Sequence, residues 1–260
     1  MTKIGVVGLG LIGGSIFKDL IKLGYDVVGI SQSQNNIEYV YSDYEYLKDC
    51  ELVFVCKEMS KTLDVLSELN SILNRETVVT DVCSLKEFVS KQEYNFNFIP
   101  SHPMAGTEFS GWKSAKEGLF EGAKWVITPL VEDDEPTILE SVITKLGSEV
   151  VYATPKEHDE AVALISHMPM VVAQALYKTA EDNPLALKLA SSGFRDMTRL
   201  ALSSVDMADD MVSMNHSNIE NSILKLYSAI GALTKNDYKS NAQDIKTART
   251  KMYKDGKNVL

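Results

Sequence analysis

Over the first 153 residues, short apolar runs of strand length alternate with stretches of helical periodicity. Runs rich in β-branched and aromatic residues predict strands at 3–7, 26–30, 51–56, 77–80, 93–99, 124–128 and 149–152. Between them, apolar side chains recur every three or four positions and predict helices at 12–23, 60–73 and 136–146. Strands that alternate with helices pair in parallel, so we expect a doubly wound α/β sheet covered on both faces.

After residue 153 the strand pattern ends and helical periodicity takes over. Spaced apolar residues, many of them Ala, Leu or Met, predict helices at 156–180, 185–203, 208–235 and 238–252. We therefore expect an α/β domain at 1–153 and an all-α domain at 154–260. An apolar stripe runs along the helical half, and packing within one chain is its simplest explanation: Met207, Met211, Met214, Ile219, Ile223, Leu226 and Ile230.

The charge balance limits the partners that this chain can bind. Its 260 residues carry a formal net charge of −10, from 26 basic and 36 acidic residues. Without a run of Lys and Arg, this balance predicts no nucleic-acid partner and no anionic membrane partner. Every apolar stretch is interrupted before the roughly 20 residues that cross a bilayer, and the glycine-rich start makes a poor signal peptide. The acidic segment at 132–135 is expected to be a solvated loop.

The cysteines indicate a reducing compartment. Cys50, Cys56 and Cys83 are odd in number, lie in apolar segments and fit no zinc-ligand or C-x-x-C spacing. We therefore expect free thiols, a cytoplasmic location and no metal site.

Three glycines, Gly8, Gly10 and Gly13, follow the first strand and open the first helix with the spacing G-x-G-x-x-G. Gly8 permits a tight turn, Gly10 lets the backbone approach a pyrophosphate, and Gly13 lets the helix pack closely on the strand. The helix N-terminus, at Leu11 and Ile12, adds partial positive charge. The pattern predicts a Rossmann-type dinucleotide-binding domain; a plain strand-to-helix turn is the alternative.

The position that would contact the adenosine ribose carries no carboxylate. Ser31, Gln32 and Ser33 follow the second strand, where an acidic residue would bind the ribose 2′-hydroxyl of NAD. Hydroxyl groups can bind a 2′-phosphate, although no Arg is nearby, so we expect NADP or NAD with a slight preference for NADP. Cys56 is a further expected cofactor contact, because ligands lie at the carboxyl ends of parallel strands.

The sequence Ser-His-Pro-Met-Ala-Gly-Thr-Glu at 101–108 directly follows the last predicted strand before residue 100. A loop histidine at the carboxyl edge of a sheet can polarise a substrate hydroxyl and accept its proton, and we expect this role for His102. The alternative is a histidine that caps a backbone carbonyl. Thr107 and Glu108 are expected near the substrate, with a solvated loop acid as the alternative for Glu108.

Six motifs occur together in the order found in one enzyme family. They are Gly-Leu-Gly-Leu-Ile-Gly-Gly-Ser at 8–15, Asp-Val-Cys-Ser-Leu-Lys at 81–86, the motif at 101–108, His158-Asp159, Ser-His-Met-Pro at 166–169 and Gly-Phe-Arg-Asp-Met-Thr-Arg at 193–199. Over residues 4–211 the chain resembles the prephenate/arogenate dehydrogenases of tyrosine biosynthesis. The resemblance implies oxidative decarboxylation of prephenate, a dianion, to 4-hydroxyphenylpyruvate with hydride transfer to NAD(P), by a homodimer joined through its helices. Arogenate, which would give tyrosine directly, is the alternative substrate.

The resemblance also implies roles for individual residues. His102 would take the proton of the ring hydroxyl, and Ser84 would orient His102 or that hydroxyl; an N-cap for a helix starting near Leu85 explains Ser84 equally well. Arg195 and Arg199 lie four apart on a predicted helix, where a dianion between them would relieve their repulsion. The alternative for Arg199 is a surface pair with Asp196.

Two further histidines lie in the predicted helix at 156–180. His158 and His167 are nine residues apart and should face opposite sides of an ideal helix. Pro169 predicts a kink near His167, which would then reach the substrate, whereas His158 is expected to be structural at the domain junction. The chain departs from the family's usual residues at Met170, where a second His is common, and at Ala208, where a Trp is common.

Two other functions are compatible with part of the pattern. A β-hydroxyacid dehydrogenase would use a helical Lys in G-x-x-x-K, which residues 231–235 match, but that segment lies too late in the chain and leaves Ser101–Pro103 unexplained. A dinucleotide sensor without catalysis would keep the glycines and would not require His102 and the arginines. Reduction of the cofactor on addition of prephenate would separate these possibilities.

Overall fold

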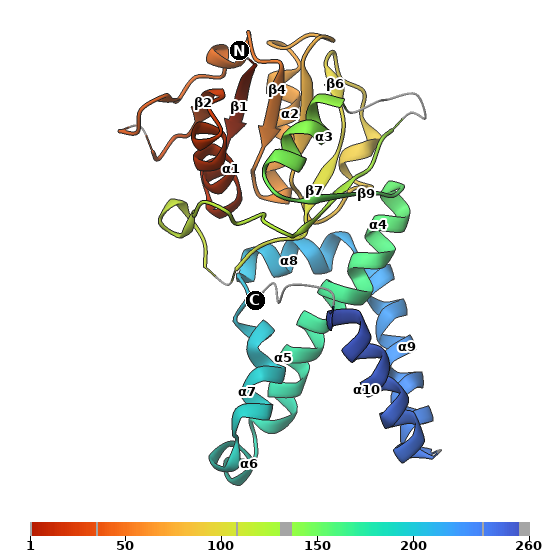
Figure 1. Ribbon diagram of the computed structural model, residues 1–260. Helices are drawn as coiled ribbons and strands as arrows, with labels where there is room; N and C mark the ends of the chain where they lie inside the picture. Colours follow the sequence, from red (N-terminus) through yellow and green to blue (C-terminus); the bar gives the residue numbers. More distant parts are fainter. Residues whose placement is uncertain (1, 35, 108, 131–136, 236, 255–260) are drawn as a thin grey trace.

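The computed structural model describes residues 2–34, 36–107, 109–130, 137–235 and 237–254. An α/β domain sits on a splayed set of helices, and helix α8 (Val205–Met214) lies directly beneath the α/β domain (Figure 1). The acidic segment at 132–135 and Glu108 lie outside the described residues.

The main sheet has six parallel strands in the order β3-β2-β1-β4-β5-β6, which confirms the predicted Rossmann-type topology. The strands are β1 (Lys3–Val7), β2 (Asp26–Ile30), β3 (Val40–Tyr41), β4 (Leu52–Val55), β5 (Val78–Asp81) and β6 (Asn97–Phe98). β6 is shorter than the predicted strand at 93–99, because Asn95 bonds through its backbone N–H and its side chain to Asn70. The strand order reverses beside β1, and ligands of open α/β sheets bind at this point.

Apolar residues cover both faces of this sheet, as expected for parallel strands. Helices α1 (Leu11–Lys22) and α3 (Thr137–Lys145) pack on one face, and α2 (Met59–Leu69) packs on the other. Along β4, Leu52 and Phe54 face the first core, whereas Val53 and Val55 face the second. This alternation explains why β4 is a continuous apolar run in the sequence.

The last three strands of the α/β domain form a separate sheet, contrary to the expectation of one parallel sheet. They are β7 (Ser101–Pro103), β8 (Lys124–Ile127) and β9 (Glu149–Tyr152), and β7 is antiparallel to β8. Only Ile99 and Pro100 separate β6 from β7, which leaves no crossover helix of the kind that a parallel pairing needs. His102 therefore lies on a strand and not on a loop.

The helical half begins where Thr154 caps α4 (Pro155–Val162). The Thr154 hydroxyl accepts the N–H of Glu157 at 3.2 Å, and the Glu157 carboxylate accepts the N–H of Thr154 at 3.0 Å. The remaining elements are the π-helical segment η4 (Ala163–His167), α5 (Met168–Ala180), α6 (Pro184–Leu189), α7 (Ser192–Thr198), the 3-10 helix η5 (Arg199–Leu202), α8, α9 (His216–Lys235) and α10 (Tyr238–Lys254).

Three of the four long helices predicted for this half are interrupted. The predicted kink near His167 is present as the π-helical segment before Pro169. The predicted helix at 185–203 is divided into α6, α7 and η5, because Ala190 and Ser191 adopt extended backbone angles. Asn215 separates α8 from α9, and its side chain contributes to the site below.

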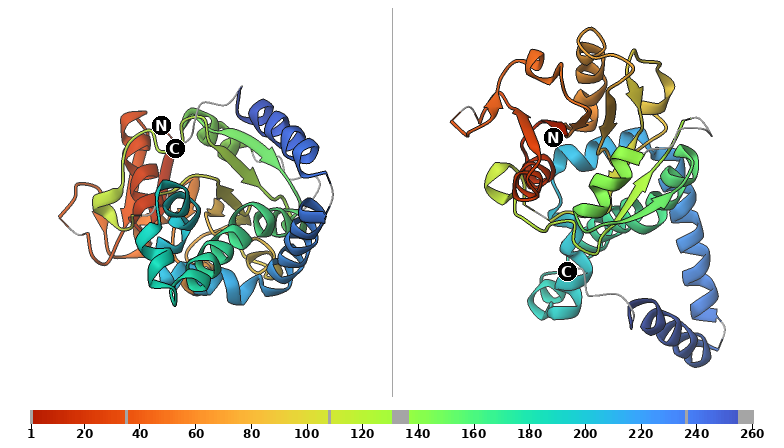
Figure 2. Two further views of the ribbon diagram at one scale, coloured as in Figure 1. Left: turned by 90° about the horizontal axis from the view of Figure 1, so that it is seen from below. Right: turned by 45° about the horizontal axis from the view of Figure 1, so that its top comes forward.

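The helices form two legs that leave large apolar side chains uncovered. Helices α5, α6 and α7 make one leg, and α9 and α10 make the other (Figures 1 and 2). The most exposed apolar side chains of the helical half include Leu189, Leu202, Val205, Tyr227 and Met252, each more than 70% exposed. The stripe along the helical half is thus only partly core: Met211 and Ile219 are buried, whereas Met207, Met214 and Ile230 are exposed.

One stretch reaches the length and apolarity of a membrane-spanning helix, contrary to the expectation from the sequence. It is the continuous helical stretch Pro155–Ala180, 26 residues long, in which a window of 18 residues has a mean hydropathy of 1.2. Length and composition alone are weak arguments for a span, and this stretch contains both His158 and His167. We therefore assign no membrane role to it.

Candidate functional site

The glycine loop has the geometry of a dinucleotide cradle. Gly8 has φ 88°, and a Cβ there would lie 2.3 Å from the carbonyl oxygen of Cys56. A Cβ at Gly13 would lie 2.0 Å from the carbonyl oxygen of Gly8, whereas a Cβ at Gly10 would meet no atom within 4 Å. Gly8 and Gly13 are thus required by packing, and Gly10 borders the open space that a pyrophosphate would occupy.

Helix α1 presents its N-terminus to this space. Gly10 is its N-cap and supplies no side-chain hydrogen bond, so the first N–H groups, at Leu11 and Ile12, remain for an anion. Cys56 packs behind the loop, where burial raises the pKa of its thiol and keeps it protonated. A nicotinamide dinucleotide fits these residues.

The turn after β2 uses Ser31 as its centre. The Ser31 hydroxyl accepts the N–H of Ser33 at 3.3 Å and the N–H of Gln34 at 3.2 Å, and the Gln32 side chain donates to the carbonyl of Ser42 at 3.0 Å. Both lone pairs of the Ser31 hydroxyl are therefore engaged, and its proton remains available for a ligand. A group that only accepts hydrogen bonds, such as a phosphate, suits that proton.

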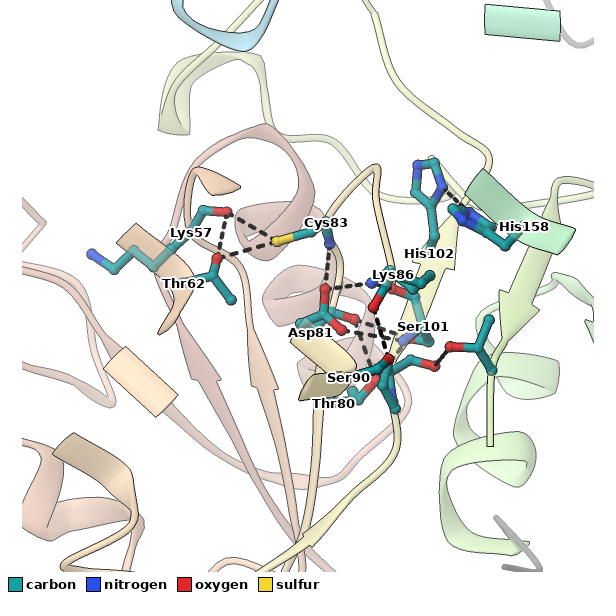
Figure 3. Close-up of polar contacts among 12 residues, drawn as sticks. Lys57, Thr62, Thr80, Asp81, Cys83, Lys86, Ser90, Ser101, His102 and His158 are labelled. Atoms are coloured by element: carbon teal, nitrogen blue, oxygen red, sulfur yellow. Dashed lines mark hydrogen bonds and ion pairs between the residues drawn. The ribbon is translucent and has the colours of Figure 1, made fainter. Parts of the chain in front are cut away.

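His102 is half-buried on β7, and its Nδ1 lies 2.9 Å from Nε2 of His158 (Figure 3). Burial lowers the pKa of His102 well below its usual value, and the positive charge of the nearby Lys86 ammonium acts in the same direction. His102 is therefore neutral near pH 7 and can accept a proton. His158 was expected to be structural at the domain junction, and the structure also places it in direct contact with the candidate base.

Asp159 holds the other end of His158. Its carboxylate accepts the Nδ1–H of His158 at 2.7 Å, and it also accepts the backbone N–H groups of Lys86 at 2.8 Å and Glu87 at 3.0 Å. The residues at 86–87 belong to the α/β domain and Asp159 to α4, so these bonds join the two halves of the chain. His158 and Asp159 are 2% and 3% exposed, and solvent does not compete for these bonds.

His167 is fully buried at the end of the π-helical segment. The amide nitrogen of Asn215 bonds to the carbonyl of Asp159 at 3.0 Å and to Nδ1 of His167 at 3.2 Å. An amide NH₂ only donates, so Nδ1 of His167 is an acceptor and its proton is on Nε2. Among the described residues, that Nε2 has no hydrogen-bond partner.

This buried N–H of His167 is available to an acceptor on a substrate. Burial lowers the pKa of His167 to about 4, so the ring is a neutral donor. The wider π turn changes the facing of residues along the helix, and the prediction of opposite faces for His158 and His167 was wrong. Asn215 bonds to His167 and to the backbone carbonyl of Asp159, the residue that follows His158.

A buried ion pair supports the strand that carries His102. Lys86 and Asp81 are both 0% exposed, and the Lys86 ammonium bonds to the Asp81 carboxylate and, at 2.6 Å, to the carbonyl of Ser101. The Ser101 hydroxyl also lies 2.7 Å from the hydroxyl of Thr80 (Figure 3). It accepts the indole N–H of Trp125 at 2.9 Å. The residue before His102 is thus held by three other elements.

Ser84 and Thr107 were both expected to act on the substrate side of the site. Ser84 is partly buried, and no helix begins at Leu85, so its N-cap alternative was wrong. Within the described ranges the Ser84 hydroxyl makes no hydrogen bond to His102. Thr107 is exposed and accepts the N–H of Phe109 at 3.3 Å.

The two arginines do not share a helix. Arg195 lies in α7, and Arg199 begins η5. Asp196 pairs with Arg195 at 3.1 Å, and among the described residues the alternative surface pair of Asp196 with Arg199 is not formed. Leu200, next to Arg199, packs in an apolar cluster with Leu85 and Met104, which places η5 near the segments that carry Ser84 and His102.

The same cluster contains both departures from the family's usual residues. Met170 and Ala208 are buried there with Met59, Cys83, Leu85, Val162 and Met211, at the junction of the two halves of the chain. A buried apolar side chain replaces a polar one at Met170, and it packs against the cluster.

Sequence reasoning assigned no role to Asp81, Lys86, Asp159 or Asn215. The sequence carried a signal for Asp81 and Lys86. Asp81 ends the apolar run of β5, and Lys86 follows within an apolar segment. Asp159 directly follows His158 in the sequence, but only the fold brings it to the N–H groups at 86–87. No local signal distinguished Asn215 from a helix boundary.

Comparison with known proteins identifies the family. The nucleotide-binding domain of prephenate dehydrogenase matches residues 23–152, and its dimerization domain matches residues 154–247. The prephenate dehydrogenases of Bacillus subtilis and Lactococcus lactis are each 32% identical to this chain, and the matches cover 82% and 77% of it. These matches span 64% and 61% of the two relatives, so the chain spans slightly less than two thirds of their length.

Solved structures agree with this assignment over the whole chain. Synechocystis arogenate dehydrogenase is 32% identical with a TM-score of 0.80, and the match covers 98% of this chain and 99% of that one. The prephenate dehydrogenase of A. aeolicus, solved with hydroxyphenyl propionate and NAD+, shares the fold at 24% identity with a TM-score of 0.85, covering 97% and 98%. The chain therefore belongs to the prephenate dehydrogenase family.

Proposed function

We propose that this protein is an NAD(P)-dependent prephenate dehydrogenase that oxidatively decarboxylates prephenate to 4-hydroxyphenylpyruvate in tyrosine biosynthesis. The observation that carries the proposal is a neutral, half-buried His102 that follows β6 in a chain whose glycine loop fits a dinucleotide. Membership of the family supports the substrate class. The free, largely buried thiols are consistent with the cytoplasmic location that we propose.

The site residues divide the reaction between them. The nicotinamide, when bound at the glycine loop, supplies the hydride acceptor. As hydride leaves the ring carbon that bears the hydroxyl, Nε2 of His102 takes the hydroxyl proton. The ring carboxylate then leaves as carbon dioxide, the electron pair of the broken C–C bond completes the aromatic ring, and the resulting phenolate oxygen takes back the proton from His102. His167 donates its buried N–H to a substrate oxygen, and Ser84 orients the hydroxyl.

Arg199 is proposed to bind a carboxylate of the substrate. With a net charge of −10, the protein as a whole repels a dianion, so local cations must bind it. Removing one partner of a charge pair that is buried in a complex costs about 2–5 kcal/mol. Arg199→Ala should therefore raise the KM for prephenate at least about thirtyfold, with little change in the KM for the cofactor. Steady-state kinetics with each ligand varied in turn measures both values.

Two further variants control the Arg199 experiment. Arg199→Lys should recover only part of the loss, because an ammonium cannot make the bidentate contact of a guanidinium. Arg195→Ala should have a smaller effect, because Arg195 already pairs with Asp196 and is 77% exposed. A normal KM for Arg199→Ala would assign Arg199 to the solvated surface.

The cofactor and the substrate can be resolved in one assay of prephenate and arogenate with NAD and NADP. We expect NADP to work at least as well as NAD, because the Ser31 hydroxyl retains only its proton for a ligand and no carboxylate repels a 2′-phosphate. A hundredfold preference for NAD would contradict this reading of Ser31.

Arogenate dehydrogenase is the alternative that the same assay tests. The identity of 32% to the Synechocystis arogenate dehydrogenase equals that to the B. subtilis prephenate dehydrogenase. A high turnover with arogenate and none with prephenate would assign this alternative. No turnover with either substrate, despite dinucleotide binding, would favour a sensor without catalysis.

The position of Lys235, the lysine that a β-hydroxyacid dehydrogenase would use, gives no support to that function. Lys235 ends α9, at the end of the leg remote from the α/β domain (Figure 1). Similarity to a 3-hydroxyisobutyrate dehydrogenase, at 13% identity and a TM-score of 0.53, concerns the fold alone.

The protein is proposed to act as a homodimer joined through the helical half. The matched dimerization domain covers residues 154–247, and large apolar side chains on these helices are exposed in the single chain. Covering such a surface with a second copy removes apolar area from water. We expect light scattering to give twice the chain mass at micromolar concentration, and a monomer would contradict the proposal.

A further inference from the structure

Three side chains form a continuous hydrogen-bonded row that ends at the candidate base. Asp159 Oδ1 lies 2.7 Å from Nδ1 of His158, and Nε2 of His158 lies 2.9 Å from Nδ1 of His102 (Figure 3 shows the contact between the two histidines). The rings of His158 and His102 meet edge to face at an interplanar angle of 73°. The proposed reaction requires only His102, so the purpose of the other two residues is open.

The protons in this row can be assigned from the Asp159 end. The Asp159 carboxylate also accepts two backbone N–H groups, from Lys86 and Glu87. Among the described residues, every hydrogen-bond partner of this carboxylate is a donor. His158 must therefore carry a proton on Nδ1, which leaves a lone pair on Nε2 if the ring is neutral. His102 must then donate from Nδ1, and its own lone pair is on Nε2.

We infer that His158, held by Asp159, is a positioning residue that selects the Nδ1–H tautomer of His102. This inference rests on the proposed function, in which His102 acts as a base. In the selected tautomer Nε2 can take the proton of a substrate hydroxyl; in the other tautomer Nε2 already carries a proton and cannot. When His102 becomes charged, its Nδ1–H still donates to His158, and the negative charge of Asp159 lies one ring away.

Burial makes this arrangement selective. His158 and Asp159 are almost fully buried, so water does not offer His102 Nδ1 an alternative partner on that side. Asp159 is also held in place by Asn215, whose amide donates to its backbone carbonyl at 3.0 Å. A residue that merely filled space at the domain junction would need neither the acceptor at Nε2 nor the carboxylate behind it.

Nitrogen-15 NMR of histidine-labelled protein tests the inference without relying on activity. The chain has four histidines, so the ring signals can be assigned with one substitution at each position. In the wild-type protein we expect His102 and His158 to be protonated at Nδ1 and His167 at Nε2. A wild-type His102 that is protonated at Nε2 would overturn the inference, whether or not the protein turns over prephenate.

The variant His158→Leu introduces an apolar side chain of similar size and removes the Nε2 acceptor of His158. We expect the His102 signals to shift toward the Nε2–H tautomer and kcat to fall roughly tenfold or more, with the KM for the dinucleotide unchanged. An unchanged His102 tautomer in this variant would show that His158 does not select it. His216→Leu, at the exposed first residue of α9, is the matched control and should leave both readouts unchanged.

The two readouts separate failure of the inference from failure of the proposed function. If prephenate and arogenate are not substrates but the tautomers are as expected, the proposed function is wrong and the selection by His158 stands. If turnover is normal in His158→Leu and His102 keeps its tautomer, the proposed function stands and the inference fails. If His158→Leu does not fold, the wild-type spectrum alone still decides the assignment of protons.

Discussion

Replacing His102 by Ala should lower kcat for prephenate by about 10²–10⁴-fold, because a positioned general base typically contributes that factor to the rate. The His102 ring is half-buried at the carboxyl edge of the sheet, and it is the neutral base that the proposed reaction requires. Dinucleotide binding should be unchanged, because the glycine loop is formed by β1 and α1. Stopped-flow or steady-state kinetics, with titration of the dinucleotide and a melting curve, gives all three quantities.

The pH dependence of the wild-type enzyme provides an independent check on His102. Its pKa is lowered in the folded protein, chiefly by burial, so the ring stays neutral as the pH falls below the usual histidine value of about 6.5. The acid limb of kcat/KM should therefore lie below that value. A variant His102→Ala with normal kcat, or a wild-type acid limb above pH 7, would show that another group is the base.

Replacing Lys86 by Met should destabilise the protein by about 3–5 kcal/mol, because it leaves the buried Asp81 carboxylate without its partner ion. Both side chains are fully buried, and Lys86 also bonds to the carbonyl of Ser101, next to His102. Urea unfolding monitored by circular dichroism measures the change in the free energy of unfolding. We expect kcat to fall as well, since β7 loses one of its supports.

Two comparisons identify the cause of the Lys86 effect. The double variant Lys86→Met with Asp81→Asn should recover much of the stability, because no unpaired charge remains in the core. Lys22→Met removes a surface ion pair with Glu117, whose side chains are 66% and 54% exposed, and should cost less than about 1 kcal/mol. An equally small cost for Lys86→Met would mean that water or a rearrangement solvates Asp81.

The architecture followed from local patterns that depend on a few residues at a time. The buried strands β1, β2 and β4 were predicted because β-branched runs flanked by helical periodicity have one stable arrangement, a parallel sheet covered on both faces. The glycine loop was predicted from the spacing of its glycines after a strand, although the steric requirement at Gly8 is set by Cys56, which is distant in the sequence. The change to helices after residue 153 was equally local.

Helix boundaries in the second half could not be predicted as well. Apolar periodicity continues across Ala190, Ser191 and Asn215, where the backbone leaves the helix. Hydrogen bonds with distant residues can outweigh the weak preference of a residue for a helix. The bonds of Asn215 to Asp159 and His167 are one such case.

The sequence by itself determined the fold class and the glycine loop, because motif spacing and strand order carry that information, and it was enough to propose His102 as the base. Only the tertiary structure decided which groups surround His102. Periodicity placed His158 and His167 on opposite faces of an ideal helix, yet a π-helical segment lies between them and Asn215 joins His167 to Asp159, the partner of His158. Asp159 meets residues 86–87 across more than 70 positions in the chain, and the Lys86–Asp81 pair becomes a support for His102 only when β5 and β7 are side by side. Such contacts depend on which elements pack together, and no local pattern encodes them.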